Sequence, residues 1–307
     1  MTKVFIDGSA GTTGLRIVDR LSARKDLELL ILPDELRKNP SARADALSAA
    51  DIAFLCLPDD AAREAAKLAQ GMKVKIIDTS TAHRTDPDWA YGMPELAGKK
   101  QIIENSSRIA NPGCHASGFV ALIAPLVEKG IVAPDTNLSC FSLTGYSGGG
   151  KKMIAEYEGA DRNPLLSAPR QYALTQQHKH LKEMVCLCGL EAAPVFCPIV
   201  ADFYSGMEVT VPLFSKDLRG SMQDIKAIYQ EYYQEGLIHF TEETDPDGML
   251  SASAFLGRDD MALTVAGNDE RILLIARFDN LGKGASGAAI QNMNILLGLD
   301  QKTGLSV

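Results

Sequence analysis

The sequence predicts an α/β protein with a Rossmann-type, doubly wound parallel sheet and a second, α+β domain built on a mixed sheet. Three observations predict this fold class. An apolar strand at the N-terminus runs directly into a glycine-rich turn and an amphipathic helix. Further apolar strands then alternate with helical segments as far as residue 78, as in a parallel sheet. Beyond residue 190, strands follow one another with few helices between them, which indicates a mixed or antiparallel sheet.

Composition narrows the classes of function. The 307 residues are 46% hydrophobic and 23% charged, which is ordinary for a globular protein long enough for two domains. A net charge of −8 argues against nucleic acid or an anionic membrane surface as the main partner. We find neither a signal peptide nor an apolar run long enough to span a membrane. The six cysteines suggest no disulfide framework, so we expect a reducing, cytoplasmic setting.

The first glycine-rich turn follows the strand Val4–Ile6 and precedes a helix. This context is the one that a dinucleotide-binding fingerprint requires, because glycines let the backbone approach the pyrophosphate at the helix N-terminus. The spacing G-x-x-G-x-x-G is one residue longer than usual in its first gap. We assign cofactor binding to Gly8, Ser9, Ala10, Gly11, Thr12, Thr13 and Gly14.

The next strands are expected at Leu27–Leu32, Ile52–Pro58 and Val74–Asp78, with a helix over Asp59–Gln70. An NAD enzyme would usually carry an acidic residue after the second strand, for the ribose 2′-hydroxyl. Here Arg37 and Lys38 could both pair with a 2′-phosphate, which favours NADP. A solvated charged loop explains the same residues equally well.

A Pro-Gly-Cys turn places Cys114 at the predicted joint between a strand and a helix. Upstream, Ile102–Ile103 and Arg108–Ala110 are interpreted as strand, and Gly118–Val127 as an apolar helix. At a helix N-terminus the unpaired N–H groups and the helix dipole favour a thiolate and could stabilise an oxyanion. Cys114 is therefore a candidate nucleophile, against the alternative of a buried structural cysteine.

Histidines are the candidate acid/base for such a nucleophile, because they titrate in the required range. His178 and His180 lie two residues apart in a segment interpreted as helical, so we expect only one of them to face the thiol. Which one is left open, and a pair of surface histidines is the alternative. Spacing of this kind on a helix is poor for chelation, and we expect no metal.

Three polar segments complete the pattern. Residues 79–84 leave the end of the fourth strand, where Arg84 could clamp a phosphate or carboxylate, or form a surface ion pair. Arg108 carries the same ambiguity. A glycine-rich stretch over residues 145–152 could close over a ligand or be a flexible loop. A second glycine-rich helix start over residues 280–287 suits the nicotinamide end of a cofactor, or the docking of the last helix onto the first domain.

Taken together, these segments resemble the shorter N-acetyl-γ-glutamyl-phosphate reductases of arginine biosynthesis over nearly the whole chain. The Pro-Gly-Cys turn and the Lys283–Asn294 segment are specific in combination. The resemblance also rests on the first glycine-rich turn, the histidine pair, and the segments Thr79–Arg84, Tyr91–Leu96 and 145–152. It implies NADPH-dependent reduction of an acyl phosphate to an aldehyde through a thioester on Cys114, with the histidine pair as acid/base. His115-Ala116-Ser117 departs from longer members, which often have an aromatic residue and threonine after the cysteine.

The resemblance extends the expected site and organisation. Arg84 matches an anion-binding arginine of the family. The remaining residues that we expect to contact NADP(H) are Arg37, Ser80, Gly282 and Gly284. The residues that we expect to contact the acyl-phosphate substrate are Arg84, Arg108, Asn111, Gly148 and Lys151.

We expect residues 1–113 and 283–307 to form the NADP-binding domain, and residues 114–282 to form the catalytic and oligomerisation domain. The resemblance suggests a homo-oligomer joined through the second domain's sheet. Aspartate-semialdehyde dehydrogenase, with the same architecture and chemistry, is the nearest alternative. A non-catalytic NADP-sensing protein is a second, and a thiol-dependent hydrolase a weaker third.

Overall fold

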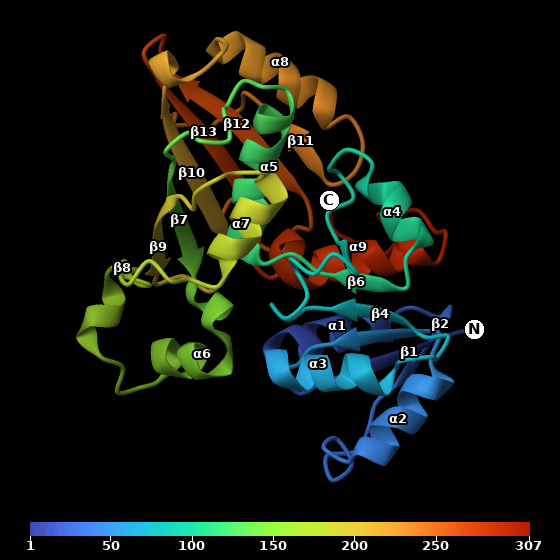
Figure 1. Cartoon of the computed structure of the whole chain (residues 1–307). Helices are drawn as coiled ribbons and strands as arrows, with labels where there is room; N and C mark the ends of the chain where they lie inside the picture. Colours follow the sequence, from blue (N-terminus) through green and yellow to red (C-terminus); the bar gives the residue numbers. More distant parts are fainter. The chain divides into compact units, whose positions relative to one another are not determined.

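The fold is taken from a computed structural model, which describes residues 1–307 apart from the side chain of Thr12. The chain divides into two compact units. Unit 1 comprises residues 1–112 and 285–305, and unit 2 comprises residues 113–284 with residues 306–307. Each unit has its own sheet, and each is described separately (Figure 1).

Unit 1 contains a six-stranded sheet whose paired strands are all parallel, in the order β2-β1-β3-β4-β6-β5. Its strands are β1 (Thr2–Asp7), β2 (Leu27–Leu30), β3 (Ile52–Leu55), β4 (Lys75–Asp78), β5 (Ala90–Tyr91) and β6 (Arg108–Ala110). Its helices are α1 (Thr12–Ser22), α2 (Pro40–Ala49), α3 (Asp59–Leu68), α4 (Lys99–Asn105) and α9 (Gly287–Leu296). The parallel order confirms the predicted doubly wound sheet.

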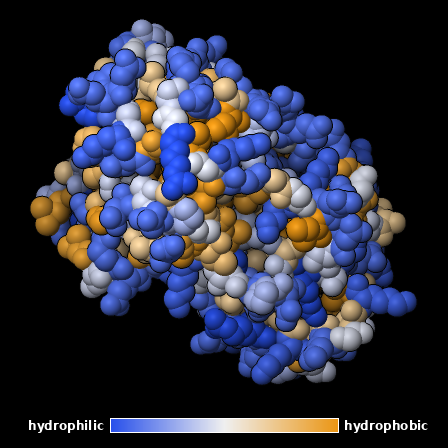
Figure 2. Space-filling view, turned by 45° about the horizontal axis from the view of Figure 1, so that its top comes forward, coloured by the Kyte–Doolittle hydropathy of each residue, from blue (hydrophilic) through white to orange (hydrophobic). Residues whose placement is uncertain are grey.

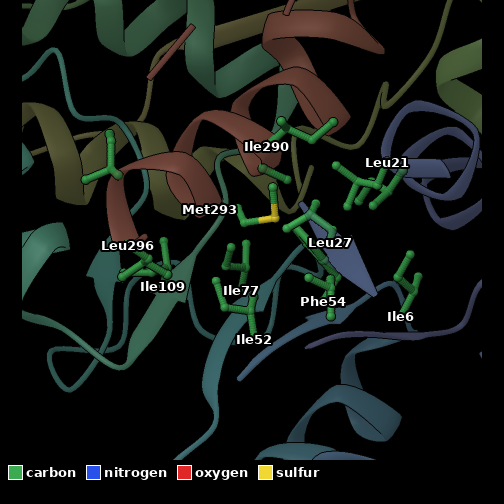
Figure 3. Close-up of a cluster of buried hydrophobic side chains, with 14 of the residues drawn as sticks. Ile6, Leu21, Leu27, Ile52, Phe54, Ile77, Ile109, Ile290, Met293 and Leu296 are labelled. Atoms are coloured by element: carbon green, nitrogen blue, oxygen red, sulfur yellow. The ribbon is translucent and has the colours of Figure 1, made fainter. Parts of the chain in front are cut away.

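Two apolar clusters show that helices cover both faces of this sheet. Alternate β1 residues point to opposite faces, so Val4 and Ile6 join one cluster while Phe5 joins the other. The first cluster packs strand residues against α1 and against Met293 of α9, which comes from the far end of the chain (Figure 3). The second packs the sheet against α2 and α3, through residues such as Leu47. The C-terminal helix is therefore part of the unit 1 core.

One predicted strand is wrong. Ile102–Ile103 lies in α4, which begins after Gly98 in the left-handed conformation, at φ 69°. Ile103 is buried and Ile102 is 49% exposed, so only one side of this short element is apolar and buried. Two adjacent apolar residues were too short a pattern to distinguish a strand from one turn of a half-buried helix.

Unit 2 contains a seven-stranded sheet in the order β11-β12-β13-β10-β7-β9-β8. The pairs β11–β12 and β7–β9 are parallel and the others are antiparallel, so the predicted mixed sheet is confirmed. Its strands are β7 (Ser139–Gly145), β8 (Arg170–Gln171), β9 (Val195–Ala201), β10 (Met207–Phe214), β11 (Ile238–Phe240), β12 (Met261–Gly267) and β13 (Arg271–Phe278). Its α-helices are α5 (Cys114–Glu128), α6 (Gly150–Glu158), α7 (His180–Cys188) and α8 (Met222–Tyr232).

The helix α5 is the central element of unit 2, and it is buried along most of its length. It packs against β10 and β13, and it also contacts α7 and α8 (Figure 1). Gly118 makes the close approach to the sheet possible, because a Cβ there would lie 2.6 Å from a Val209 methyl carbon and 2.9 Å from Phe278. Tyr233 of the α8 C-cap donates its hydroxyl to the carbonyl of Ala121 at 2.8 Å. The first residue of α5 is thus held by a rigid helix.

The opposite face of the unit 2 sheet, here called the outer sheet face, carries exposed apolar side chains. The strand register places them on one side, since Phe141 pairs with Thr210 and Pro212 pairs with Leu273. The outer sheet face includes Phe141, Leu143, Val195, Cys197, Ile199, Thr210, Pro212, Phe214 and Leu273. The same register places the charged Glu208, Arg271 and Arg277 on this face. Figure 2 shows, on the face in view, that hydrophobic side chains also reach the surface among a hydrophilic majority.

Of the helices in the described part of the chain, none combines the length and apolar character needed to cross a bilayer.

Candidate active site

Cys114 is the first residue of α5, as the sequence predicted. Gly113 is the N-cap, with an extended φ of −83° and ψ of 142°, and no side chain caps the helix there. The thiol is half-buried and free of any disulfide. Gly284 packs directly against it, since a Cβ on Gly284 would lie 2.9 Å from the Cβ of Cys114. This close approach explains a glycine at position 284.

Three histidine rings gather around the residue that directly follows Cys114. His115 follows Cys114 on α5, and its ring centroid lies 5.6 Å from that of His178 and 5.5 Å from that of His180. The rings of His178 and His180 are themselves 4.7 Å apart. The expectation that the two point in different directions from one helix is wrong, because α7 begins only at His180. His178 lies in the preceding turn, where its ring can fold back toward the same place.

Hydrogen bonds fix the orientation of two of these rings. The backbone N–H of His180 donates to Nδ1 of His178 at 3.3 Å, so the proton of a neutral His178 is on Nε2. Nδ1 of His115 lies 2.6 Å from Oγ of Ser142, and its Nε2 lies 2.6 Å from Oη of Tyr172. Neither Ser142 nor Tyr172 was found from the sequence, because they come from β7 and from a segment after β8 that only the fold brings to α5.

Burial favours the neutral form of His115 and His178. It lowers the pKa of His115 from 6.5 to about 3, and the nearby charge of His178 adds to this effect. Burial also lowers the pKa of His178, with a further contribution from Lys179. Burial raises the pKa of the Tyr172 phenol, and the charge of the Cys114 thiolate raises it further. A neutral histidine can accept a proton, as general base catalysis requires.

A carboxylate fixes the turn before Cys114. Glu183 of α7 is 2% exposed and accepts the backbone N–H of Gly113 at 2.8 Å from its Oε1. Because Glu183 lies one helical turn after His180, it faces the same side of α7. The bond therefore ties α7, which carries a candidate acid/base, to the start of α5. The sequence alone gave no signal for this contact between segments seventy residues apart.

The segment after β13 is fixed by Asp279 and Asn280, which are both buried. Asp279 accepts four hydrogen bonds, from the backbone N–H groups of residues 257, 281 and 282 and from the hydroxyl of Ser205. Asn280 accepts the N–H of Gly206 and donates to Oγ of Ser147 at 3.1 Å. This network holds the π-helical segment Gly282–Ser286, and with it Gly284, in place.

The glycine-rich stretch after β7 is helical rather than a loop. Residues Tyr146–Gly149 form a 3₁₀ turn that continues into α6. A Cβ on Gly148 would lie 3.4 Å from the Asn280 amide nitrogen, so this predicted substrate residue lies against the buried network. Lys151, the other predicted substrate residue here, is exposed on α6.

In unit 1 the first glycine turn is closely packed. Gly8 has φ 86°, and a Cβ there would lie 2.3 Å from the Cys56 carbonyl oxygen. A Cβ on Gly14 would lie 2.4 Å from the carbonyl oxygen of Gly8. Gly11 is the N-cap of α1, and no side chain caps that helix. Ser9 is buried, Ala10 and Thr13 are half-buried, and the side chain of Thr12 lies outside what the structure describes.

Asp7, at the end of β1, fixes the start of this turn. Its carboxylate accepts two hydrogen bonds from the buried Arg43 of α2, at 2.7 Å and 3.0 Å. Burial nevertheless raises the pKa of Asp7, against the opposing effect of Arg43. Arg43 was not found from the sequence, because α2 follows a loop with no apolar periodicity to predict its place. Arg37, the predicted 2′-phosphate residue, forms an ion pair with Asp34 at 2.5 Å.

The segment after β4 is also pinned by a buried carboxylate. Asp78 accepts from the backbone and side chain of Ser80, at 2.9 Å and 2.8 Å, and its Oδ2 lies 2.7 Å from Nδ1 of His83. The ring of His83 stacks on Trp89 at 4.0 Å. The predicted cofactor residue Ser80 is therefore held in a rigid turn at the carboxyl end of β4.

Arg84 is buried and donates to the carbonyl oxygens of Asn111 at 2.9 Å and Thr79 at 3.1 Å. It thus joins the ends of β4 and β6. Asn111 donates its amide to the carbonyl of Ala285 at 3.0 Å. Arg108 lies at the start of β6, with its guanidinium 5.7 Å from the Trp89 ring centroid. Burial lowers the pKa of Arg108.

Among the described residues, the structure contains no group of three or more His, Cys, Asp or Glu side chains arranged to hold a metal ion.

Comparison with known proteins identifies the class that this fold and site define. Two family models match in tandem: the NAD-binding domain of semialdehyde dehydrogenases over residues 33–104, and their dimerisation domain over residues 114–280. Solved structures agree on the fold. Aspartate semialdehyde dehydrogenase II of Vibrio cholerae aligns with a TM-score of 0.74 at 18% identity, covering 97% of this chain and 98% of that one. The enzyme of Candida albicans with NADP aligns with a TM-score of 0.66 at 17% identity, covering 97% and 98%.

Sequence similarity is more specific. Proteins named N-acetyl-γ-glutamyl-phosphate reductase from Brucella ovis and Brucella canis are each 45% identical to this chain over 306 residues, covering 96% of this chain and 99% of theirs. The chain belongs to the N-acetyl-γ-glutamyl-phosphate reductase family, within the semialdehyde dehydrogenases.

Proposed function

We propose that this protein reduces N-acetyl-γ-glutamyl phosphate to N-acetylglutamate semialdehyde with release of phosphate, as a step of arginine biosynthesis. Cys114 is the nucleophile and the carrier of a thioester. The observation that supports this most is the position of Cys114 at the start of a rigid, buried helix, directly before the buried, neutral His115. The near full-length similarity to reductases of that name supplies the substrate.

The chain's own groups account for the acyl transfer. The N-terminus of α5 stabilises negative charge on the Cys114 sulfur before attack. The sulfur bonds to the acyl carbon, and collapse of the tetrahedral adduct breaks the carbon–oxygen bond to phosphate. His180 or His178 is the acid/base that moves a proton when the aldehyde leaves. Removing such a group typically lowers the rate by about 10²–10⁴.

The first unit matches an NAD(P)-binding domain, and we assign NADP(H) as its cofactor. The residues present fit such a group, because Gly8 and Gly14 leave no room for a Cβ in a turn that opens an uncapped helix. When bound, the cofactor supplies the hydride that reduces the thioester. We assign Arg37 to the 2′-phosphate of the cofactor. Binding the phosphate would replace its ion pair with Asp34. We assign Ser80, Gly282 and Gly284 to the same cofactor.

For the substrate we assign five residues, in two kinds of role. Arg84 and Asn111 order the ends of β4 and β6 and supply polar groups there. Lys151 supplies a mobile positive charge for the phosphate, and Gly148 lets the backbone approach the ligand. We also assign Arg108 to the substrate, as a positively charged side chain that could bind its phosphate or carboxylate.

We further propose that the protein is a homo-oligomer joined through the outer sheet face. The matched dimerisation domain covers this sheet. Phe141, Val195 and Phe214 are 46%, 59% and 56% exposed on this face, and clustered exposed apolar side chains are typical of interaction surfaces.

The test of the proposed function is phosphate-dependent oxidation of two aldehydes by the purified protein, with NADP⁺ in excess. We expect activity with N-acetylglutamate semialdehyde and little with aspartate semialdehyde, and no activity in Cys114→Ser with either. Activity only with the aspartate compound would show an aspartate-semialdehyde dehydrogenase instead. NADP⁺ binding without turnover of either aldehyde would favour the sensing protein.

A further inference from the structure

We propose that Ser142 and His115 form a fixed hydrogen-bond relay that leaves the phenol proton of Tyr172 free to bind the oxyanion formed at Cys114. Tyr172 is then a catalytic hydrogen-bond donor, and Ser142 and His115 are positioning residues. The proposal rests on the proposed function for the identity of the acyl substrate, but not for the relay itself.

The first step is the direction of the bond at Ser142. Its side chain is fully buried, and Nδ1 of His115 at 2.6 Å is its one recorded hydrogen-bond partner in the described part of the chain. A buried hydroxyl hydrogen without an acceptor costs about 1–3 kcal/mol. The Ser142 O–H therefore donates to Nδ1 of His115, which must be unprotonated to accept it.

The second step follows at the other ring nitrogen. A neutral imidazole carries one proton, so in this arrangement the proton is on Nε2 of His115. Nε2 then donates to Oη of Tyr172, 2.6 Å away. Tyr172 accepts one bond through its oxygen, and its own O–H remains available as a donor. In the opposite arrangement, Nδ1 of His115 would donate to Ser142 and Nε2 would accept the Tyr172 O–H. The Ser142 proton would then have no acceptor.

The third step concerns the position of the Tyr172 phenol proton relative to Cys114. His115 directly follows Cys114 on α5, and Tyr172 lies close enough to Cys114 for the thiolate charge to raise the pKa of the phenol, in addition to burial. The ring of Tyr172 also lies 6.1 Å from that of His178. The phenol therefore belongs to the same cluster as the nucleophile and the candidate acid/base histidines.

The chemistry requires no net proton transfer to Tyr172. When the Cys114 sulfur bonds to the acyl carbon, the C=O electron pair moves onto oxygen, and that oxyanion accepts the Tyr172 O–H. The pair returns to re-form C=O as the bond to phosphate breaks. An oxyanion of the same kind forms when the thioester is reduced. Removing one such donor from an oxyanion site typically lowers kcat by about 10²–10³.

The relay should act without titrating. The charged and titratable groups around it are Cys114, His178, His180 and Lys179. His115 has a pKa of about 3, and burial raises that of Tyr172, so both stay neutral where the enzyme is assayed. Tyr172→Phe should thus lower the rate by the same factor at every pH from about 6 to 9, leaving the inflections of the pH profile in place.

The experiment uses the full chain and two readouts. Cys114 acylation by acetyl phosphate, without cofactor, is followed by intact mass, because this probe tests the relay even if the proposed substrate is wrong. We expect Tyr172→Phe to acylate at least about tenfold more slowly, with iodoacetamide alkylation of Cys114 unchanged. The matched control is Tyr232→Phe, which removes a phenol bonded to Glu128 on the surface of the same unit. It should acylate at the wild-type rate.

The second readout is the tautomer. Nitrogen-15 NMR of histidine-labelled protein should show His115 with its proton on Nε2, and Ser142→Ala should perturb that signal. A proton on Nδ1 would overturn the relay. Acylation of Tyr172→Phe less than about tenfold slower than wild type would overturn the role of the phenol. A parallel loss of Cys114 alkylation would overturn it too, because it would mean that Tyr172 acts on the thiol.

Discussion

At the scale of single residues, the site depends on buried polar side chains whose charge state is set by burial. His115 shows this most clearly, because it lies beside the nucleophile and yet its pKa falls to about 3. An imidazolium there would repel a second positive charge and could not accept the Ser142 proton. Burial thus keeps a constant hydrogen-bond pattern around Cys114 at physiological pH.

This burial has a consequence for stability. Below its ordinary pKa of 6.5, His115 binds a proton in the unfolded chain, but the folded protein binds it only near pH 3. The stability that the buried, neutral His115 contributes is therefore fully present above pH 6.5. It is lost as the pH falls from there toward 3, at up to about 1.4 kcal/mol per pH unit. Between pH 7.5 and 5, we expect wild type to lose about 2 kcal/mol more than His115→Gln. Urea unfolding of both proteins at both pH values measures this, and parallel pH dependences would contradict it.

Glu183 gives a second prediction at this scale. Its carboxylate accepts the N–H of Gly113, and Glu183→Ala leaves that buried donor unpaired. We expect a loss of about 1–3 kcal/mol in unfolding free energy, with a further loss of activity because the turn before Cys114 relaxes. Glu231→Ala, an exposed position on α8, is the control and should change stability by less than about 0.5 kcal/mol. Equal urea midpoints for both variants would show that the Glu183 bond is dispensable.

At the scale of elements, glycines decide where the chain can pack closely. Alanine normally stabilises a helix by about 1 kcal/mol relative to glycine, so Gly14→Ala in α1 would be favourable on propensity alone. The structure reverses that sign, because the new Cβ would lie 2.4 Å from the Gly8 carbonyl oxygen. We expect a lower melting temperature and NADP⁺ affinity reduced at least about tenfold, a loss of 1.4 kcal/mol.

Gly11→Ala is the control for this steric effect, because it tests whether any substitution of a glycine in the turn destabilises the protein. Its Cβ would come no closer than 3.4 Å to the Gly8 carbonyl oxygen, so we expect a melting temperature near that of wild type. Thermal unfolding of the two variants compares them directly. Equal destabilisation of both would contradict the packing argument.

The same scale shows what the sequence could predict. Val4–Ile6, the glycine turn and the helix after Cys114 were predictable because each has a strong local pattern, and the structure has them in place. Ile102–Ile103 was assigned wrongly because two apolar residues do not define a period. His178 was placed on a helix that in fact begins two residues later, since helix ends are set by local turn geometry.

The partners around the site were not predictable, for a different reason. Ser142, Tyr172 and Glu183 reach α5 from β7, from beyond β8 and from α7. Each is an ordinary residue in its own segment, and only the tertiary contact gives it a role. Cys114 could be proposed as the nucleophile from the sequence because that proposal depends on a local turn and helix start, which the structure has in place.

At the scale of the whole molecule, unit 2 leaves one face of its sheet uncovered by helices and rich in apolar side chains. If this outer sheet face is the dimer interface, a charge there should weaken assembly. We expect Phe141→Glu to shift the protein toward monomer in light scattering at micromolar concentration. Ile102→Glu, at a similarly exposed position in unit 1 (49% against 46%), should leave the assembly intact. Unchanged assembly in Phe141→Glu would place the interface elsewhere.

The thioester on Cys114 is tested on the whole chain. Intact mass is measured after mixing the protein with N-acetyl-γ-glutamyl phosphate in the absence of NADPH. The wild type should gain the mass of one acyl group, which disappears when NADPH is added, and Cys114→Ser should gain none. No adduct on the wild type, or an adduct that persists in Cys114→Ser, would contradict the thioester on Cys114.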